Sequence, residues 1–189
     1  MKFELGASVV GFEAEKGHVA GVKLADGRTI PCDAAVIGVG AHPNDELASE
    51  SGLETARGVV VDLRARTFDP RVFAIGDVAH WRMPLYGRMF RMESVPNALE
   101  QAKQAACSIT GRPAPAGEVP WQWSDQYDLK LQIAGYAFDA DATIVRGSAS
   151  SGQFAVFHLK GDPLQSVEPM NSPPDYDGPT AHREPQGTR

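Results

Sequence analysis

Residues 67–79 read TFDPRVFAIGDVA, and this stretch gives the strongest indication of the fold class. Its apolar run 72–77 predicts a short buried strand that ends in Gly76-Asp77, which places a carboxylate at the edge of an α/β sheet where such folds bind ligands. A carboxylate accepts hydrogen bonds from sugar-alcohol hydroxyls, and Gly76 lets a ligand approach the backbone closely. The alternative is that Asp77 only caps a following helix. Both interpretations stay open on these residues alone.

The residues before this stretch read mainly as strands. Alternating or β-branched runs separated by hairpin-length turns predict an antiparallel meander over 8–13, 18–24 and 28–30. Residues 34–40 (AAVIGVG) are continuously apolar, as is typical of a strand buried on both faces of an α/β sheet. A short helix is expected over about 43–51, and a further strand at 59–62.

The residues after it predict one helix and a second layer of strands. Apolar side chains recur at helical spacing over 96–110, and Gly111 ends this helix. Residues 112–120 are rich in Pro, Ala and Gly and read as a linker. A small antiparallel layer is then expected from four runs, 129–134, 143–146, 154–160 and 164–168. From residue 172 onward the composition predicts a disordered tail.

Composition narrows the classes of function. The net charge of −6 disfavours a nucleic-acid partner, which needs a basic patch. The sequence has neither an apolar run that could span a bilayer nor a secretory pattern at Met1, so no membrane partner and a cytoplasmic protein are expected. Cys32 and Cys107 are too far apart for a CxxC pair and are expected to be buried. The histidines lack metal-ligand spacing, so no metal site is proposed.

Four segments together resemble the FAD-dependent pyridine-nucleotide oxidoreductases. Residues 67–79 resemble their second flavin-binding motif, and residues 38–44 (GVGAHPN) resemble the strand end that leaves their nicotinamide domain. Residues 91–102 (RMESVPNALEQA) and 120–128 (PWQWSDQYD) resemble the ferredoxin reductases of the putidaredoxin and rhodocoxin reductase type.

Two positions depart from that pattern, because His42 stands where an Arg is common and Gln122 replaces the usual Phe. A disulfide-reductase branch is less favoured, since its His-Pro pair lies near the end of the dimerisation domain. The only His-Pro pair here is His42-Pro43.

The resemblance implies a fold class of α/β and α+β. It is a partial two-dinucleotide-domain fold that binds FAD and NAD(P), followed by a small reductase carboxyl-terminal domain. Residues 1–40 would be the end of the NAD(P)-binding domain, and residues 41–115 the carboxyl-terminal portion of the FAD-binding domain. Residues 116–171 would form the reductase carboxyl-terminal domain, and residues 172–189 the tail.

The resemblance also implies cofactor contacts but no catalytic side chain. Asp77 would hold the ribityl chain of FAD, and the helix start at Val95 would stabilise negative charge at the N1–C2=O edge of the flavin ring. Trp123 would cover the ring, on a face that it shares with Trp121 if the segment is extended. Plain helix capping by Ser94 and ordinary core packing of the tryptophans are the structural alternatives. The implied cofactor-binding residues are Gly76, Asp77, Ser94, Val95, Trp123 and Gly40.

The implied function is part of a flavoprotein that passes electrons from NAD(P)H through FAD to a 2Fe–2S ferredoxin. The sequence lacks a GxGxxG unit after a strand, so both cofactors are incompletely supported. The alternative is therefore a non-catalytic, truncated remnant. Alone, the chain is expected neither to hold one FAD nor to oxidise NAD(P)H. Exposed apolar surface would favour its association, for instance as a homodimer.

Overall fold

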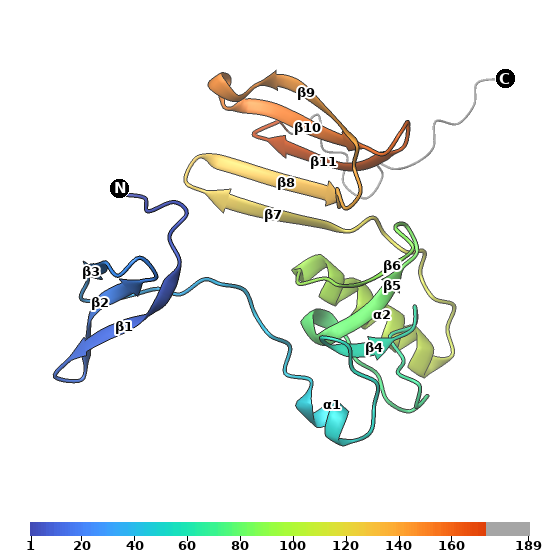
Figure 1. The fold of residues 1–189 in the computed structure, drawn as a ribbon. Helices are drawn as coiled ribbons and strands as arrows, with labels where there is room; N and C mark the ends of the chain where they lie inside the picture. The colour runs from blue at the N-terminus through green and yellow to red at the C-terminus, as the bar shows by residue number, and fades with distance from the viewer. Residues whose placement is uncertain (173–189) are drawn as a thin grey trace. The chain divides into compact units, whose positions relative to one another are not determined.

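In the computed structural model, which describes residues 1–172, the amino-terminal strands form the predicted antiparallel meander (Figure 1). They belong to the first of two units, Met1–Ala41, and the second unit begins at His42. The strands are β1 (Val9–Glu15), β2 (His18–Leu24) and β3 (Thr29–Pro31), paired in that order. The β1–β2 turn has positive φ angles at Lys16 and Gly17, as a two-residue hairpin turn requires.

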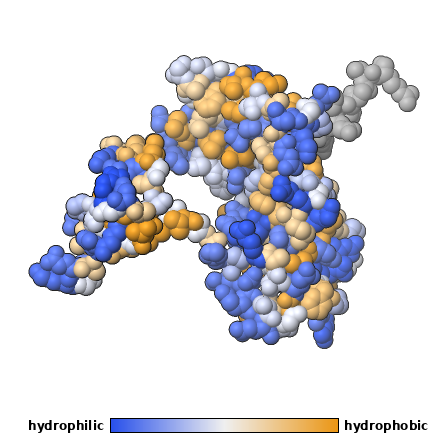
Figure 2. Space-filling view, in the orientation of Figure 1, coloured by the Kyte–Doolittle hydropathy of each residue, from blue (hydrophilic) through white to orange (hydrophobic). Residues whose placement is uncertain are grey.

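The apolar run at 34–40 does not form the buried strand that the sequence predicts. It has no secondary structure, and Val36 and Val39 are 100% and 87% exposed. Figure 2 shows this stretch as hydrophobic surface open to solvent. A strand needs neighbours for its backbone N–H and C=O groups, and no strand among residues 1–172 pairs with this run. The prediction of a doubly buried strand is therefore wrong for this structure.

The second unit opens with a short helix and a mixed three-stranded sheet. Helix α1 (Glu46–Glu50) and strand β4 (Val59–Val61) lie where the sequence predicts them. Strand β4 pairs in parallel with β5 (Ala79–Met83), which pairs antiparallel with β6 (Arg88–Arg91). Buried side chains of β4 and β5 form the core of this sheet.

The prediction of a strand at 72–77 is wrong, and the sequence did not predict the β5–β6 hairpin. Phe73 makes a single bridge to Arg66, and a 3-10 turn, η1 (Gly76–Val78), leads into β5. Gly76 has a φ of +73°. This left-handed backbone cannot continue an extended strand, so the chain turns there.

Helix α2 (Val95–Thr110) confirms the predicted helix and both of its ends. The Ser94 side chain accepts a hydrogen bond from the backbone N–H of Asn97 at 3.3 Å, which is a helix amino-terminal cap. Gly111 ends the helix with a φ of 68°. Within residues 1–172, the structure has no helix long and apolar enough to cross a membrane. Cys32 and Cys107 are unpaired and only partly buried, so the prediction of buried cysteines is wrong.

Residues 121–170 form a five-stranded antiparallel sheet of order β7-β8-β11-β10-β9. Its strands are β7 (Trp121–Gln126), β8 (Leu129–Gly135), β9 (Ala142–Ser148), β10 (Gln153–Leu159) and β11 (Leu164–Met170). The four predicted runs are confirmed as strands, and β7 is the fifth. A 3-10 turn, η2 (Ala149–Ser151), links β9 to β10. Of the predicted disordered tail, residues 173–189 lie outside the described part of the chain.

A tyrosine joins the β5–β6 hairpin to this sheet. The Tyr86 hydroxyl donates to the Gln165 carbonyl oxygen at 3.1 Å and accepts from the Tyr136 N–H at 2.7 Å. The Tyr86 ring packs edge-on against Phe138, with 5.2 Å between ring centroids. Burial of the phenol raises the pKa of Tyr86 to about 12. The hairpin and the sheet are thus held together by contacts far apart in sequence.

Candidate cofactor site

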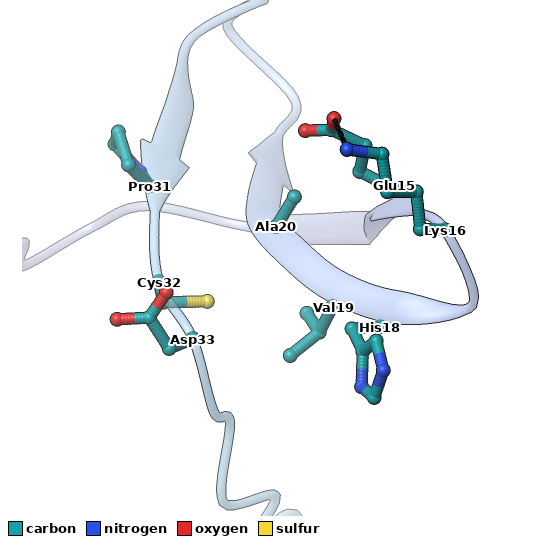
Figure 3. Close-up of a pocket in the computed structure, with 8 residues that line it drawn as sticks. All are labelled: Glu15, Lys16, His18, Val19, Ala20, Pro31, Cys32 and Asp33. Atoms are coloured by element: carbon teal, nitrogen blue, oxygen red, sulfur yellow. Dashed lines mark ion pairs between the residues drawn. The ribbon is translucent and has the colours of Figure 1, made fainter.

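A hollow in the first unit carries none of the predicted cofactor residues. It measures about 550 Å³ and lies between the β1–β2 turn and the end of β3 (Figure 3). Figure 3 shows Lys16 paired with Glu15, at 3.8 Å. Because the hollow also carries the acidic side chain of Asp33, it offers little attraction for a phosphate. This hollow is not a candidate dinucleotide site.

In the second unit, the Gly-Asp pair of η1 lies against helix α2. The Gly76 N–H donates to the Gln101 side-chain oxygen at 2.7 Å, and this bond is buried. A Cβ added to Gly76 would lie 3.7 Å from the Cβ of Ala98. That is an ordinary contact, so the positive φ rather than crowding makes glycine the suitable residue here. Gly76 and Gln101 together fix the turn that carries Asp77.

The Asp77 carboxylate is exposed to solvent. Among residues 1–172 no group donates a hydrogen bond to it, whereas its backbone oxygen accepts from Arg91 Nη1 at 2.7 Å. The backbone of Asp77 is therefore held while its carboxylate is left open. Such a group accepts hydrogen bonds from hydroxyls, so its chemistry fits the ribityl chain of FAD.

The amino end of α2 offers an unpaired donor. The Ser94 hydroxyl and carbonyl accept from Asn97 and Ala98, respectively, and Pro96 has no N–H. In the described part of the chain this leaves the N–H of Val95 without a hydrogen-bond partner. A helix amino terminus with a free N–H attracts anions and carbonyl oxygens. This donor fits the N1–C2=O edge of a flavin.

Two tryptophans of β7 present a flat aromatic surface. Trp121 and Trp123 stack with 5.5 Å between ring centroids and 30° between ring planes, which confirms that they share one face. Trp123 is 49% exposed and is not a core residue. A half-exposed indole that is backed by a second indole can cover a planar ligand.

The structure brings most of the predicted residues into one unit. Gly76 and Asp77 pack on α2, the helix that begins at Ser94 and Val95, and α2 in turn contacts β7, which carries Trp123. Gly40 lies in the first unit, with a φ of +89°, and its role stays a prediction. Among residues 1–172, no cluster of His, Cys, Asp or Glu could hold a metal ion.

Two residues that position Asp77, namely Gln101 and Arg91, were not identified from the sequence. Gln101 is 2% exposed, and its side-chain oxygen also lies 3.5 Å from Asn97 Nδ2. The signal was present, because Asn97, Gln101 and Gln104 recur at helical spacing on one face of α2. Buried amides are nearly always hydrogen-bonded, so a polar helical stripe indicates specific partners. The hydrogen bond from Arg91 to the backbone of Asp77 has no comparable pattern of residues in the sequence that could have predicted it.

Known protein families match both parts of the chain. Residues 1–102 match the pyridine nucleotide-disulphide oxidoreductase family, and residues 121–178 match the reductase C-terminal family. The chain is 52% identical over 177 residues to a probable ferredoxin reductase, CtmF, of Castellaniella defragrans. It is 40% identical over 173 residues to putidaredoxin reductase CamA of Pseudomonas putida. These alignments cover 93% and 90% of this chain but only 43% and 41% of the two relatives.

Solved structures agree with these matches. The chain superimposes with a TM-score of 0.87 on a crystal structure of a covalent putidaredoxin reductase–putidaredoxin complex, at 40% identity. A ferredoxin reductase for the CYP199A2 system of Rhodopseudomonas palustris gives a TM-score of 0.85 at 42% identity. The matches cover 91% and 90% of this chain and 42% of each solved chain. They confirm the expected fold class, part of a two-dinucleotide-domain fold followed by a reductase carboxyl-terminal domain.

Proposed function

The chain belongs to the pyridine nucleotide-disulphide oxidoreductase family, and we propose that it supplies the ribityl and flavin-ring contacts of an FAD-dependent ferredoxin reductase. In that enzyme electrons pass from NAD(P)H through FAD to a 2Fe–2S ferredoxin. FAD, when bound, supplies the change from two-electron to one-electron chemistry, and the protein orients and tunes it.

The observation that carries the proposal is the open Asp77 carboxylate on a turn that is itself held to α2. In this role Asp77 accepts hydrogen bonds from ribityl hydroxyls, and the free N–H of Val95 donates to the N1–C2=O edge of the ring. The half-exposed indole of Trp123 covers the ring and excludes water. Gln101 and Arg91 act through the backbone of η1 and position Asp77.

The proposal extends to the domains and to the partner. Residues 1–40 would end the NAD(P)-binding domain, with Gly40 near the cofactor. Residues 41–115 would complete the FAD-binding domain, and residues 116–171 would form the reductase carboxyl-terminal domain. The similarity to a reductase solved with putidaredoxin supports a ferredoxin as the electron acceptor. We place this activity in the cytoplasm as part of the proposal. Because the chain spans about two fifths of its curated relatives, the activity is proposed for the complete fold.

The test uses a chimaera in which the amino-terminal part of the Castellaniella relative precedes this chain. Asp77→Ala should weaken FAD binding by about 1.5–3 kcal/mol, because it removes a charged hydrogen-bond acceptor. That loss corresponds to roughly a 10- to 150-fold rise in Kd, measured by flavin fluorescence titration. Asp128→Ala, the same change on the exposed β7–β8 turn, is the matched control and should leave the Kd unchanged. Equal FAD binding by parent and Asp77→Ala would refute the assignment.

The 189-residue chain alone gives a second test. It contains the contacts described above but no GxGxxG phosphate cradle, so it should not retain one FAD after desalting. Flavin absorbance and NADH oxidation with ferricyanide as acceptor are the two measurements. A yellow protein with one flavin per chain and steady turnover would contradict this expectation.

A further inference from the structure

Arg91, the last residue of β6, joins the two elements that carry the proposed ribityl and ring contacts. Its Nη1 donates to the backbone oxygen of Asp77 in η1 at 2.7 Å. Its Nη2 pairs with Glu93 Oε1 at 2.5 Å, and Glu93 directly precedes the α2 cap, Ser94. One guanidinium therefore bridges the turn that presents the Asp77 carboxylate and the helix start that presents the Val95 N–H.

The bridge depends on the shape and the charge of the arginine side chain. A guanidinium is a planar fork whose N–H groups can bind two acceptors at once, whereas an ammonium is a single point charge. The Arg91 side chain is only 13% exposed, so its charge needs nearby acceptors in place of water. The carboxylate of Glu93 supplies a charged acceptor, and it holds the guanidinium in the direction of η1.

The segment that carries Glu93 is itself fixed to α2. The side-chain amide of Asn97 donates to the Met92 carbonyl oxygen at 2.9 Å, and this bond is buried. The backbone N–H of Asn97 donates to the Ser94 hydroxyl at 3.3 Å. Because Glu93 lies between these two anchored residues, its backbone cannot move independently of the helix start. The position of the helix start is thus passed through Glu93 and Arg91 to the backbone of η1.

A buried glycine makes room for the stem of the arginine. A Cβ added to Gly58 would lie 2.9 Å from Cδ of Arg91 and 2.6 Å from the Val78 carbonyl oxygen. Both distances are too short for a real Cβ. The Gly58 N–H donates to the Asp45 carboxylate at 2.7 Å, which holds this stretch of backbone in place. A side chain at Gly58 would therefore displace Arg91 or the residues next to η1.

We propose that Arg91 is a positioning residue that fixes the spacing between the ribityl contact at Asp77 and the ring contact at Val95, with Glu93 orienting its guanidinium. The inference rests on the proposed flavin function, and it makes FAD affinity depend on Glu93 and Gly58 as well. Arg91 and Glu93 act through the two contacts rather than on the cofactor itself. Such a bridge strengthens binding because the two contacts are already ordered before FAD arrives.

The test is a double-mutant cycle in the chimaera with the Castellaniella relative, read as the FAD Kd from flavin fluorescence titration. Arg91→Lys keeps the charge but loses the fork, and it should raise the Kd about tenfold in the parent. In the Asp77→Ala background the same change should raise the Kd less than about twofold, because no carboxylate is left to position. A residue that only stabilised the fold would weaken FAD binding equally in both backgrounds.

The matched control is Arg88→Lys, the same change on the same strand. Arg88 lies at the other end of β6, where it pairs with Asp139 at 3.6 Å and has no contact with η1 or Glu93 among the printed ion pairs of the chain's described part. This variant should bind FAD with the Kd of the parent. A loss equal to that of Arg91→Lys would show that any change of arginine in β6 weakens the site, and it would overturn the proposal.

Glu93→Gln keeps the proposal testable even if Arg91→Lys folds poorly, because the Glu93 side chain is 41% exposed. It should raise the FAD Kd about fivefold in the parent and less than about twofold in Asp77→Ala. The full 189-residue chain gives a measurement without flavin. There Glu93→Gln should speed hydrogen exchange of the Gly76 amide in η1, whereas Arg88→Lys should not.

The outcomes separate this inference from the flavin assignment. Asp77→Ala that weakens FAD binding, together with unchanged binding in Arg91→Lys and Glu93→Gln, would overturn the bridge and leave Asp77 in its role. Equal fold losses in the two backgrounds, or unchanged exchange at Gly76 in Glu93→Gln, would also overturn it. Unchanged FAD binding in Asp77→Ala would instead refute the proposed ribityl contact.

Discussion

Removal of one hydroxyl group, in Tyr86→Phe, should loosen the contact between the β5–β6 hairpin and the five-stranded sheet. The ring would remain, together with its edge contact to Phe138 at 5.2 Å. The Gln165 carbonyl and the Tyr136 N–H would each lose a partly buried partner, at 3.1 and 2.7 Å in the parent. Because a polar group left unpaired keeps its desolvation cost, we expect the free energy of unfolding to fall by about 1–3 kcal/mol.

The assay is urea unfolding followed by tryptophan fluorescence, with the midpoint and slope compared at neutral pH. Tyr127→Phe is the matched control, since it deletes the same atom from a side chain that is 100% exposed. The control should change stability by less than about 0.5 kcal/mol. If Tyr86→Phe and Tyr127→Phe unfold at the same urea concentration, the Tyr86 hydroxyl does not join the hairpin to the sheet.

The same residue predicts a loss of stability at high pH. Burial raises the pKa of Tyr86 to about 12, whereas a tyrosine in the unfolded chain titrates near about 10. The contribution of Tyr86 is therefore fully present below about pH 10 and is lost as the pH rises through about 12. Burial also raises the pKa of Tyr136, so absorbance at the tyrosinate band should show two late-titrating tyrosines in the parent and one in Tyr86→Phe. Two late-titrating tyrosines in that variant would refute the pKa assignment.

Three further predictions concern the backbone and the flavin-motif region. Gly135→Ala should cost about 2 kcal/mol or more in urea unfolding, because φ is +85° and the new Cβ would collide with a backbone carbonyl of β11. Gly152→Ala, at φ +69° with open space, should cost only about 1 kcal/mol, and equal losses would contradict the steric argument. Ser94→Ala should cost about 1 kcal/mol by thermal unfolding, through loss of the α2 cap. The pKa of Asp69 is lowered to about 2, first by the side-chain hydrogen bond from Arg71. The contribution of Asp69 to stability is therefore present above about pH 4 and is lost as the pH falls through about 2. An NMR titration that gives Asp69 an ordinary pKa would refute this prediction.

Local features of the fold could be predicted from the sequence. Helix α2 begins and ends where Ser94 and Gly111 indicate, because a cap depends on residues within about four positions of it. The alternation of side chains along a strand likewise predicts the hairpin of β1 and β2. It also predicts that Trp121 and Trp123 share one face of β7.

Features that depend on distant partners were decided by the tertiary structure alone. The apolar run at 34–40 has the composition of a buried strand, yet it stays exposed because no described strand pairs with it. The Tyr86 hydroxyl bonds groups that lie 50 and 79 residues away, and the amide of Gln101 meets a backbone N–H 25 residues away. The local sequence does not indicate which groups these partners are. The spacing of residues determines on which face of a helix or strand a side chain lies. The group that this side chain binds reaches that face only when the whole chain is folded.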